Sequence, residues 1–420
     1  MKKNYPFPLP FLVCITIVAI LTFSCKKDHP ASIPILTTSA ITNITDSAAS
    51  SGGKITSDGG SPVQGRGVTW DTSAAFLHPA ETNDGTGTGS FSSSITGLVP
   101  GTTYYVRAYA VNAVGTGYGD VVKFTTGYVP SKYTVTTIAG SGAAGRVDGN
   151  GVSASFSSPD GVCVDPSGNI IVADGANMII RKITPGGTVT TLALTDGFPY
   201  DVAADASGNI YISESSLKIL KLTPAGTISV FAGSGTKANV DGTGTAASFY
   251  EPFTLATDGY GNLYVGDHLS IRKITPSGVV STLPNNLSVN TAVATDKFNN
   301  LYISDGFVIK MVDTLGVPHF IAGGQGSADG FGATAGFNQI VELKVDQAGN
   351  IYAADISNNK IRMITPAGFV TTFAGTGLQG AADGNAAIAT FNGPSGLAID
   401  AVGTIYVADF GNNKIRKISQ

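Results

Sequence analysis

Residues 345–368 read VDQAGNIYAADISNNKIRMITPAG, and this stretch decides the fold of most of the chain. A turn of the Asp-x-x-Gly-Asn kind at 346–350 leads into an apolar run that begins with Ile351-Tyr352 and ends at a second acid, Asp355. Another apolar run, 360–364, stops at a Thr-Pro-Ala-Gly turn. Short β-branched and aromatic runs between turns of this composition predict antiparallel strands.

The pattern occurs six times, and each copy has a turn aspartate followed by a second acid nine residues later. The pairs are Asp165/Asp174, Asp205/Glu214, Asp258/Asp267, Asp296/Asp305, Asp346/Asp355 and Asp400/Asp409. One strand before the aspartate turn and another after the second turn bring the complete copies to four strands. Four-stranded units repeated at intervals of about 40–50 residues predict an all-β fold, a six-bladed β-propeller.

The sixth copy has no fourth strand after Lys417. Residues 133–140 (YTVTTIAG), directly before the first copy, are similar to the fourth strand at 370–375. Because an open repeat array would expose an unpaired strand edge, we expect residues 133–139 to complete the sixth blade and close the propeller.

The repeat resembles the NHL family, which also shows the aspartate turn, the tyrosine strand and an Ile-Arg strand such as 271–274. Enzymes on similar propellers hold a metal in the central channel. Zinc lyases of this type need several histidines, whereas only His268 and His319 occur in this region. Gluconolactonase-like propellers use calcium held by acids and amides of first strands, which makes Glu251, Asn290 and Glu342 weak candidates for a catalytic calcium site.

Asp160 and Asp201 are further candidates for channel chemistry, because they lie in first strands but outside the repeated pairs of acids. No complete set of metal ligands is apparent, so no cofactor is expected, with calcium kept as the open possibility.

One face of the propeller is expected to carry long loops, at 140–156, 233–249, 323–337 and 375–391. Each loop contains an Asp-Gly pair and, eight residues after that aspartate, a phenylalanine that we expect to anchor the loop. Loops on a rigid scaffold are where binding usually resides. The loop aspartates are therefore the predicted binding-face residues: Asp148, Asp241, Asp329 and Asp383.

The N-terminus combines Lys2-Lys3, an apolar run at 9–23 and the sequence Ser24-Cys25. A small residue before a cysteine at this place resembles the lipobox of bacterial lipoproteins, which implies cleavage before Cys25 and its lipidation. An ordinary secretory peptide with an incidental cysteine is the alternative. After processing Cys163 would be the one cysteine without lipid, so no intrachain disulfide is expected.

Residues 33–127 read as short strands separated by Gly, Ser and Asp clusters, typical of a β-sandwich. The segment 98–112 (LVPGTTYYVRAYAVN) resembles the second half of a fibronectin type III domain. Period-2 alternation predicts that Val106, Ala108 and Ala110 share one face of the strand. Tyr105, Arg107 and Tyr109 share the other.

These features divide the chain into a signal peptide (1–24), a lipid anchor and tether (25–32), a sandwich (33–127), a linker (128–132) and the propeller (133–420). Four glutamates against 25 aspartates, with 54 glycines, exclude a mainly helical protein. A net charge of −4 without a long basic run argues against nucleic acid as a partner.

We expect a binding scaffold, attached by lipid to the bacterial cell envelope, that presents the loop face to a protein, peptide or glycan. Residues 128–420 contain 22 acids and 17 bases, which favours a cationic or neutral polar partner. The alternative is a calcium-dependent hydrolase or lyase of the gluconolactonase-like type, acting in the channel.

The lipid anchor gives the first testable prediction. Replacing the acylated cysteine (Cys25→Ala) should move the protein from the detergent phase to the aqueous phase of a Triton X-114 partition, because acyl chains contribute about 0.8 kcal/mol per buried methylene. A Cys14→Ala variant, changed within the signal, is the control and should stay in the detergent phase. A Cys25→Ala protein that remains with the detergent would contradict lipidation at this residue.

Overall fold

The computed structural model describes residues 30–77, 79–99, 101–126, 132–268, 270–284, 292–313 and 315–420. Within these ranges the chain is all-β, as predicted, and its helices are single 3-10 turns. The turns are η2 (Gly151–Ser153), η3 (Gly175–Asn177), η4 (Gly244–Ala246), η5 (Gly332–Thr334), η6 (Ile356–Asn358) and η7 (Phe410–Asn412). No helix in the described part of the chain is long and apolar enough to cross a membrane.

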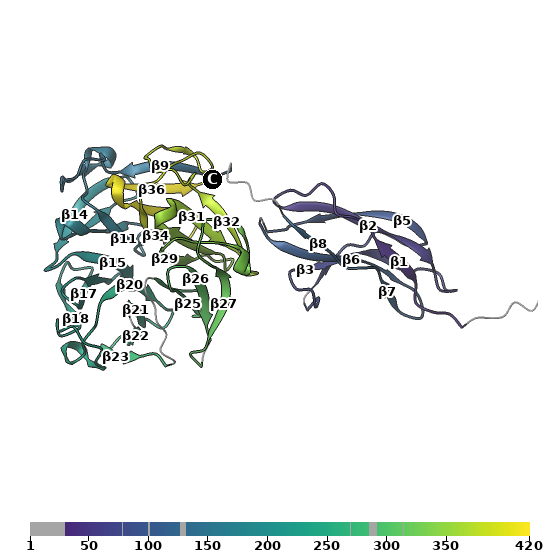
Figure 1. Ribbon diagram of the computed structural model, residues 1–420, viewed down its shortest axis with the longest axis horizontal. Helices are drawn as coiled ribbons and strands as arrows, with labels where there is room; N and C mark the ends of the chain where they lie inside the picture. The colour runs from purple at the N-terminus through teal and green to yellow at the C-terminus, as the bar shows by residue number, and fades with distance from the viewer. Residues whose placement is uncertain are drawn as a thin grey trace, which may run out of the picture.

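The N-terminal strands form two antiparallel sheets (Figure 1). The first contains β1 (Ile35–Thr38), β2 (Ala48–Ser57) and β5 (Gly89–Thr96). The second contains β4 (Ala80–Glu81), β3 (Gly65–Asp71), β6 (Thr103–Val111) and β7 (Thr116–Tyr118), with β8 (Val122–Thr125) also paired to β6. Ala49 and Ile95 of the first sheet share one core with Val68 and Val106 of the second. The predicted alternation in β6 is confirmed, since Val106, Ala108 and Ala110 are fully buried.

Six further antiparallel sheets follow in chain order, and each pairs four long strands (Figure 1). From the inner strand outwards, the first three are β11 (Pro159–Val164), β12 (Ile170–Asp174), β13 (Ile179–Ile183), β14 (Thr188–Leu194), β10 (Gly149–Asn150); β15 (Pro199–Ala204), β16 (Ile210–Glu214), β17 (Lys218–Leu222), β18 (Ile228–Ala232); and β20 (Pro252–Thr257), β21 (Leu263–Asp267), β22 (Ser270–Ile274), β23 (Val279–Thr282), β19 (Gly242–Thr243).

The last three sheets, in the same direction, are β24 (Ala292–Thr295), β25 (Leu301–Ser304), β26 (Val308–Val312), β27 (Pro318–Gly323); β29 (Ile340–Val345), β30 (Ile351–Asp355), β31 (Lys360–Ile364), β32 (Phe369–Ala374), β28 (Gly330–Phe331); and β34 (Pro394–Ile399), β35 (Ile405–Asp409), β36 (Lys414–Ser419), β9 (Thr134–Ala139), β33 (Gly384–Asn385).

The first strands of these sheets form the inner ring of the propeller. Each contacts the first strand of the next sheet, and β34 in turn contacts β11. The turn aspartate stabilises the turn that connects the first strand to the second. In the fifth sheet, Asp346 Oδ1 accepts hydrogen bonds from the backbone N–H groups of Ala348 (2.9 Å) and Asn350 (2.8 Å).

Strand β9, from the N-terminal side of the propeller, lies in the last sheet beside β36 (Figure 1). Its Val135 is fully buried in the core of that sheet, and the backbone pairs Val135 with Ile418. The outer edge of β9 is covered in turn by β33.

Strand β9 is expected to determine whether the propeller folds as one unit. Deleting residues 133–139 should abolish the cooperative thermal transition, because β36 would lose its outer neighbour and expose an unpaired edge. The measurement is differential scanning calorimetry. The control is Thr136→Asp, which places a charge at an exposed position of the same strand and should melt like the unchanged protein. An unaltered melting curve for the deletion would contradict this role of β9.

Candidate ligand site at the mouth of the channel

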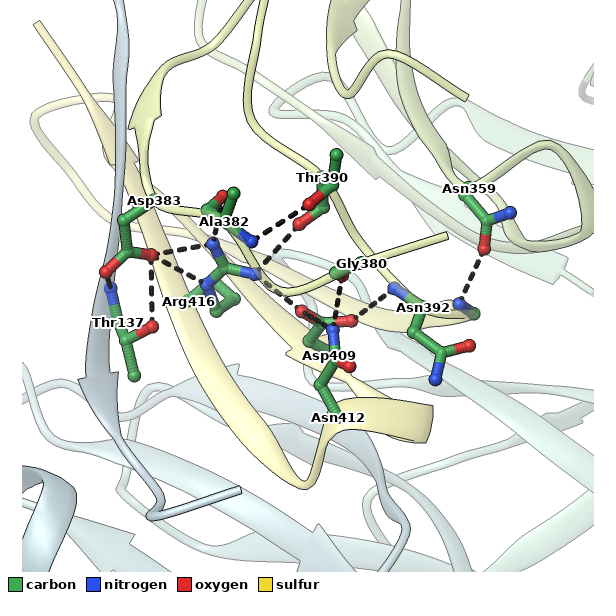
Figure 2. A network of polar contacts seen from close by, with 11 residues as sticks. Thr137, Asn359, Gly380, Ala382, Asp383, Thr390, Asn392, Asp409, Asn412 and Arg416 are labelled. Carbon is green, nitrogen blue, oxygen red and sulfur yellow. Dashed lines mark hydrogen bonds and ion pairs between the residues drawn. The ribbon is translucent and has the colours of Figure 1, made fainter. Parts of the chain in front are cut away.

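A buried arginine on the third strand organises each of the four long-loop sheets, and Arg416 on β36 is the example drawn in Figure 2. Its Nη1 donates to Asp409 Oδ2 (2.6 Å) and to the carbonyl oxygen of Thr390 (3.1 Å). Its Nη2 donates to Asp383 Oδ1 (2.6 Å) and to the carbonyl oxygen of Ala382 (2.9 Å). One guanidinium thus joins the second strand to both sides of the long loop.

The other three arginines make the same contacts through Nη1 and Nη2, but their buried Nε groups have no hydrogen-bond partner in the described structure, whereas that of Arg416 donates to Asp383 (3.2 Å). Each is completely buried between a fully buried strand acid and a loop aspartate that is about half exposed. Each guanidinium carbon lies 4.9–5.2 Å from the centre of a loop phenylalanine ring. The sets are Arg181 with Asp174, Asp148 and Phe156; Arg272 with Asp267, Asp241 and Phe249; Arg362 with Asp355, Asp329 and Phe337; and Arg416 with Asp409, Asp383 and Phe391.

The two sheets that begin without a long loop lack this arginine. Leu220 takes its place in β17, and Lys310 in β26 forms a more exposed pair with Asp305 at 3.1 Å. The arginine therefore accompanies the loop. The predicted binding residues Asp148, Asp241, Asp329 and Asp383 act in this structure as loop anchors; direct contact with a partner stays a prediction for them.

The proposed calcium ligands are not brought together within the described residues. Glu251 Oε1 accepts a hydrogen bond from Lys237 Nζ (3.0 Å), and its other oxygen lies 3.9 Å from His268 Nδ1. Glu342 pairs with a different cation, Lys344. Asn290 lies outside the described residues. In the described part of the chain, no three His, Cys, Asp or Glu side chains form a group that could hold a metal ion.

The reason for this separation lies in the register of the strands. Counted back from the turn aspartate, Glu251 is at position −7, Asn290 at −6 and Glu342 at −4. These positions are not equivalent in the repeat, and the side chains of Glu251 and Glu342 therefore do not belong to one layer of the channel.

Position −4 forms one layer at the mouth of the channel, on the face that carries the long loops. The residues of this layer are Gly161, Asp201, Thr254, Ala292, Glu342 and Gly396. All except Ala292 line a cavity of about 320 Å³. Gly161 is needed for the close approach of β11 to β15, because a Cβ atom there would lie 2.3 Å from Asp201 Oδ1.

The remaining wall of the cavity is mainly aromatic and apolar. Tyr200 and Phe253 precede the layer in their strands, with ring centres 4.8 Å apart. Phe410 and Ile356 contribute from the turns between second and third strands. Asp160, next to Gly161 in β11, adds a carboxyl group. The two candidates Asp160 and Asp201 are thus brought into one cavity with Glu342.

Two carboxyl groups of the cavity, those of Asp201 and Glu342, are held firmly by hydrogen bonds, and one hydroxyl group is an exception. Asp201 accepts backbone hydrogen bonds from Val202 at Oδ1 and from Leu255 at Oδ2, both at 2.7 Å. Glu342 Oε1 accepts from Lys344 Nζ (2.5 Å). The exception is the buried hydroxyl of Thr254, which has no hydrogen-bond partner in the described structure.

Burial is the main cause of the shifted pKa values in this cavity. It raises the pKa of Asp160 to about 7, with a further contribution from Asp201, while a hydrogen bond from Ser395 opposes the shift. It raises the pKa of Glu342 to about 8, assisted by Asp201 and opposed by Lys344. Burial disfavours the charge of Lys344, but Glu342 and Asp201 outweigh it and raise the pKa of the ammonium group.

A second cavity of about 220 Å³ lies further along the first strands, towards the opposite face. Lys344 and Cys163 line it together with small residues such as Ala203 and Ala256. The Glu342–Lys344 ion pair joins a residue of the upper cavity to one of the lower cavity and so lies between them. Cys163 is a free, buried thiol whose pKa is raised by burial, consistent with its expected structural role.

Several residues of the site were not singled out from the sequence, above all Thr254, Tyr200, Phe253 and Lys344. The sequence did contain a pattern that could have pointed to these residues. Position −4 varies in size and charge, and position −2 holds small residues in every copy except the one with Lys344. Variation at fixed positions of a regular repeat marks the side chains that are free to differ from blade to blade.

Comparison with known proteins agrees with this architecture. The family model of the NHL repeat matches residues 156–183 and 391–418, so the chain contains NHL repeats. Protein SUPPRESSOR OF QUENCHING 1, chloroplastic, of Arabidopsis thaliana is 26% identical over 319 residues, which cover 68% of this chain and 27% of that protein. The chain thus spans about a quarter of the length of this curated relative.

Two solved structures from Bacteroides thetaiotaomicron show the same fold over 93% of the chain. One is described as a structural genomics protein of unknown function (TM-score 0.59, 19% identity, 99% of that chain covered). The other is described as an auxiliary nutrient binding protein (TM-score 0.57, 18% identity, 98% covered).

The arginine network predicts unequal roles for its two acids. Asp174→Ala should lower the free energy of unfolding by about 3–5 kcal/mol, because Arg181 would keep a buried charge without its buried partner. Asp148→Ala removes the partner that is half exposed and should cost about 1 kcal/mol or less for the ion pair. Urea denaturation at pH 7 measures both. Equal losses would contradict the distinction between the strand acid and the loop acid.

Proposed function

We propose that this protein is an extracytoplasmic binding protein, anchored by lipid to the bacterial cell envelope, whose propeller binds its ligand at the loop face. The ligand is a small molecule, or the exposed end of a peptide, glycan or protein, that enters the mouth of the channel. The role is recognition rather than turnover.

The observation that carries this proposal is the cavity at the mouth of the channel. It combines three carboxyl groups, aromatic walls and the unpartnered hydroxyl of Thr254, and residues of five of the six inner strands line it. A concave, largely apolar pocket with a few converging polar groups is the usual form of a ligand site. A buried hydroxyl without a partner costs free energy that a ligand can recover by hydrogen bonding.

The anchor and the sandwich complete the proposal. Cys25 lies outside the described residues, so lipidation is carried here from the sequence alone. The sandwich acts as a spacer that holds the propeller away from the lipid surface. Nutrient binding, the role named for one of the Bacteroides proteins, is the kind of function that we infer for this chain.

The calcium-dependent enzyme receives less support. Glu251 and Glu342 are committed to different cations, Lys237 and Lys344. Their positions in the repeat are not equivalent, which argues against one shared ion. A calcium arm in the binding experiment separates the two functions.

The experiment is a thermal-shift panel on the full chain in detergent, with monosaccharides, amino acids, small amines and calcium chloride as probes. A ligand at 100 times its Kd stabilises by about 2.7 kcal/mol, which corresponds to a rise in Tm of roughly 5–10 °C for a domain of this size. We expect at least one organic probe to produce such a shift, and Phe253→Ala to abolish it by removing a wall of the cavity.

The exposed loop-face carboxylate Asp196 provides the matched control, and Asp196→Asn should keep the shift. A shift of equal size in Phe253→Ala, or none with any organic probe, would contradict the cavity as a ligand site. Stabilisation by calcium that disappears in Glu251→Gln would support the enzyme instead.

A further inference from the structure

The cavity at the mouth of the channel has an excess of acidic groups. Asp160 on β11, Asp201 on β15 and Glu342 on β29 line it together. The nearby cation Lys344 is committed to Glu342 by a contact of 2.5 Å. Within the described ranges, no lysine, arginine or histidine forms an ion pair with Asp160 or Asp201.

Asp160 accepts a hydrogen bond from Ser395 and is the carboxyl group with capacity left for a ligand. The oxygens of Asp201 both accept backbone hydrogen bonds, which fix the side chain, although burial raises the pKa of this carboxyl group as well. Asp160 lies close enough to Asp201 for a negative charge on Asp201 to add to the effect of burial, which raises the pKa of Asp160. A carboxyl group in this setting retains a proton that a cation placed beside it would displace.

The walls of the cavity favour a cation over an anion. Tyr200 and Phe253 present adjacent rings, and Phe410 adds a third aromatic side chain. The face of an aromatic ring carries negative potential and attracts ammonium groups, most strongly where water is excluded. The same rings offer apolar surface to the carbon skeleton that bears the charge.

The hydroxyl oxygen of Thr254 supplies an independent indication of a ligand. It is buried, lines the same cavity and has no partner in the part of the chain that the structure describes. An N–H group could donate to this oxygen. The volume of about 320 Å³ is at the lower end of the range of about 300–1,000 Å³ for ligand pockets, which limits the buried group to the size of one ring.

We infer that the cavity binds a protonated primary amine, with Asp160 as its counter-ion, Thr254 as a hydrogen-bond acceptor and the rings of Tyr200 and Phe253 against its apolar part. The amine belongs to a small molecule or to the end of a larger one. This inference rests on the proposed function, since it names the chemical class of ligand for the same site.

The test uses pairs of probes that differ in the amine. Isothermal titration calorimetry on the full chain in detergent compares 2-phenylethylammonium with 2-phenylethanol, and glucosamine with glucose. A charge-assisted hydrogen bond in a buried site predicts that at least one amine binds about tenfold more tightly, or better, than its hydroxyl counterpart. The preference should fall about tenfold in Asp160→Asn and persist in Asp196→Asn.

Two results would overturn the inference. One is binding of the neutral members as tightly as the amines. The other is no binding of either amine, while a different probe binds in a way that depends on Phe253. Either result contradicts the amine inference but leaves the proposed function intact. If no probe binds in a way that depends on Phe253, the inference and the proposed function are both contradicted. The preference measured in the unchanged protein needs no substitution, so a folding defect in Asp160→Asn does not prevent the test.

Discussion

The structure of the propeller depends on a buried guanidinium whose charge must be balanced, and whose Nη groups must find hydrogen-bond acceptors, away from water. An arginine brings five N–H donors and a permanent charge, and burying them without partners costs several kcal/mol. In four sheets the partners come from two directions. The second strand supplies a buried acid, and the long loop supplies an aspartate and backbone carbonyl groups. The loop must therefore fold back over its own sheet, and a phenylalanine then fills the space beneath the guanidinium.

This requirement separates the scaffold of the protein from its site. The ion pairs of Arg181, Arg272, Arg362 and Arg416 with the strand acids are nearly identical. They hold the four long loops in the same way and do not distinguish one sheet from another. Distinction arises in the inner ring, where the layer that contains Asp201, Thr254 and Glu342 differs at almost every strand. The repeated arginine networks thus surround a cavity whose lining differs from strand to strand. Residues that line the cavity can change without disturbing these networks.

The propeller architecture could be predicted from the sequence because the patterns that indicate it are local. The interval of nine residues between Asp346 and Asp355 reports two strands and the turn between them, and six repetitions imply the architecture. The site depends on which side chains of different strands share a layer, and that follows from strand register. Glu251 and Glu342 each lie near the start of a first strand, yet a difference of three positions in the repeat separates them. The lack of a partner for Thr254 could not be read from the chain at all, because it depends on every neighbouring strand.

The pairing of β9 with β36 also affects when the propeller can form. These strands are the first and the last of the propeller along the chain, and Asp383 of the intervening loop hydrogen-bonds to Thr137 as well as to Arg416 (Figure 2). During synthesis β9 emerges early but has no strand to pair with until β36 follows. The ring cannot close on the growing chain before its final blade is made, so the earlier blades must persist with an open edge for most of the time that the chain takes to appear.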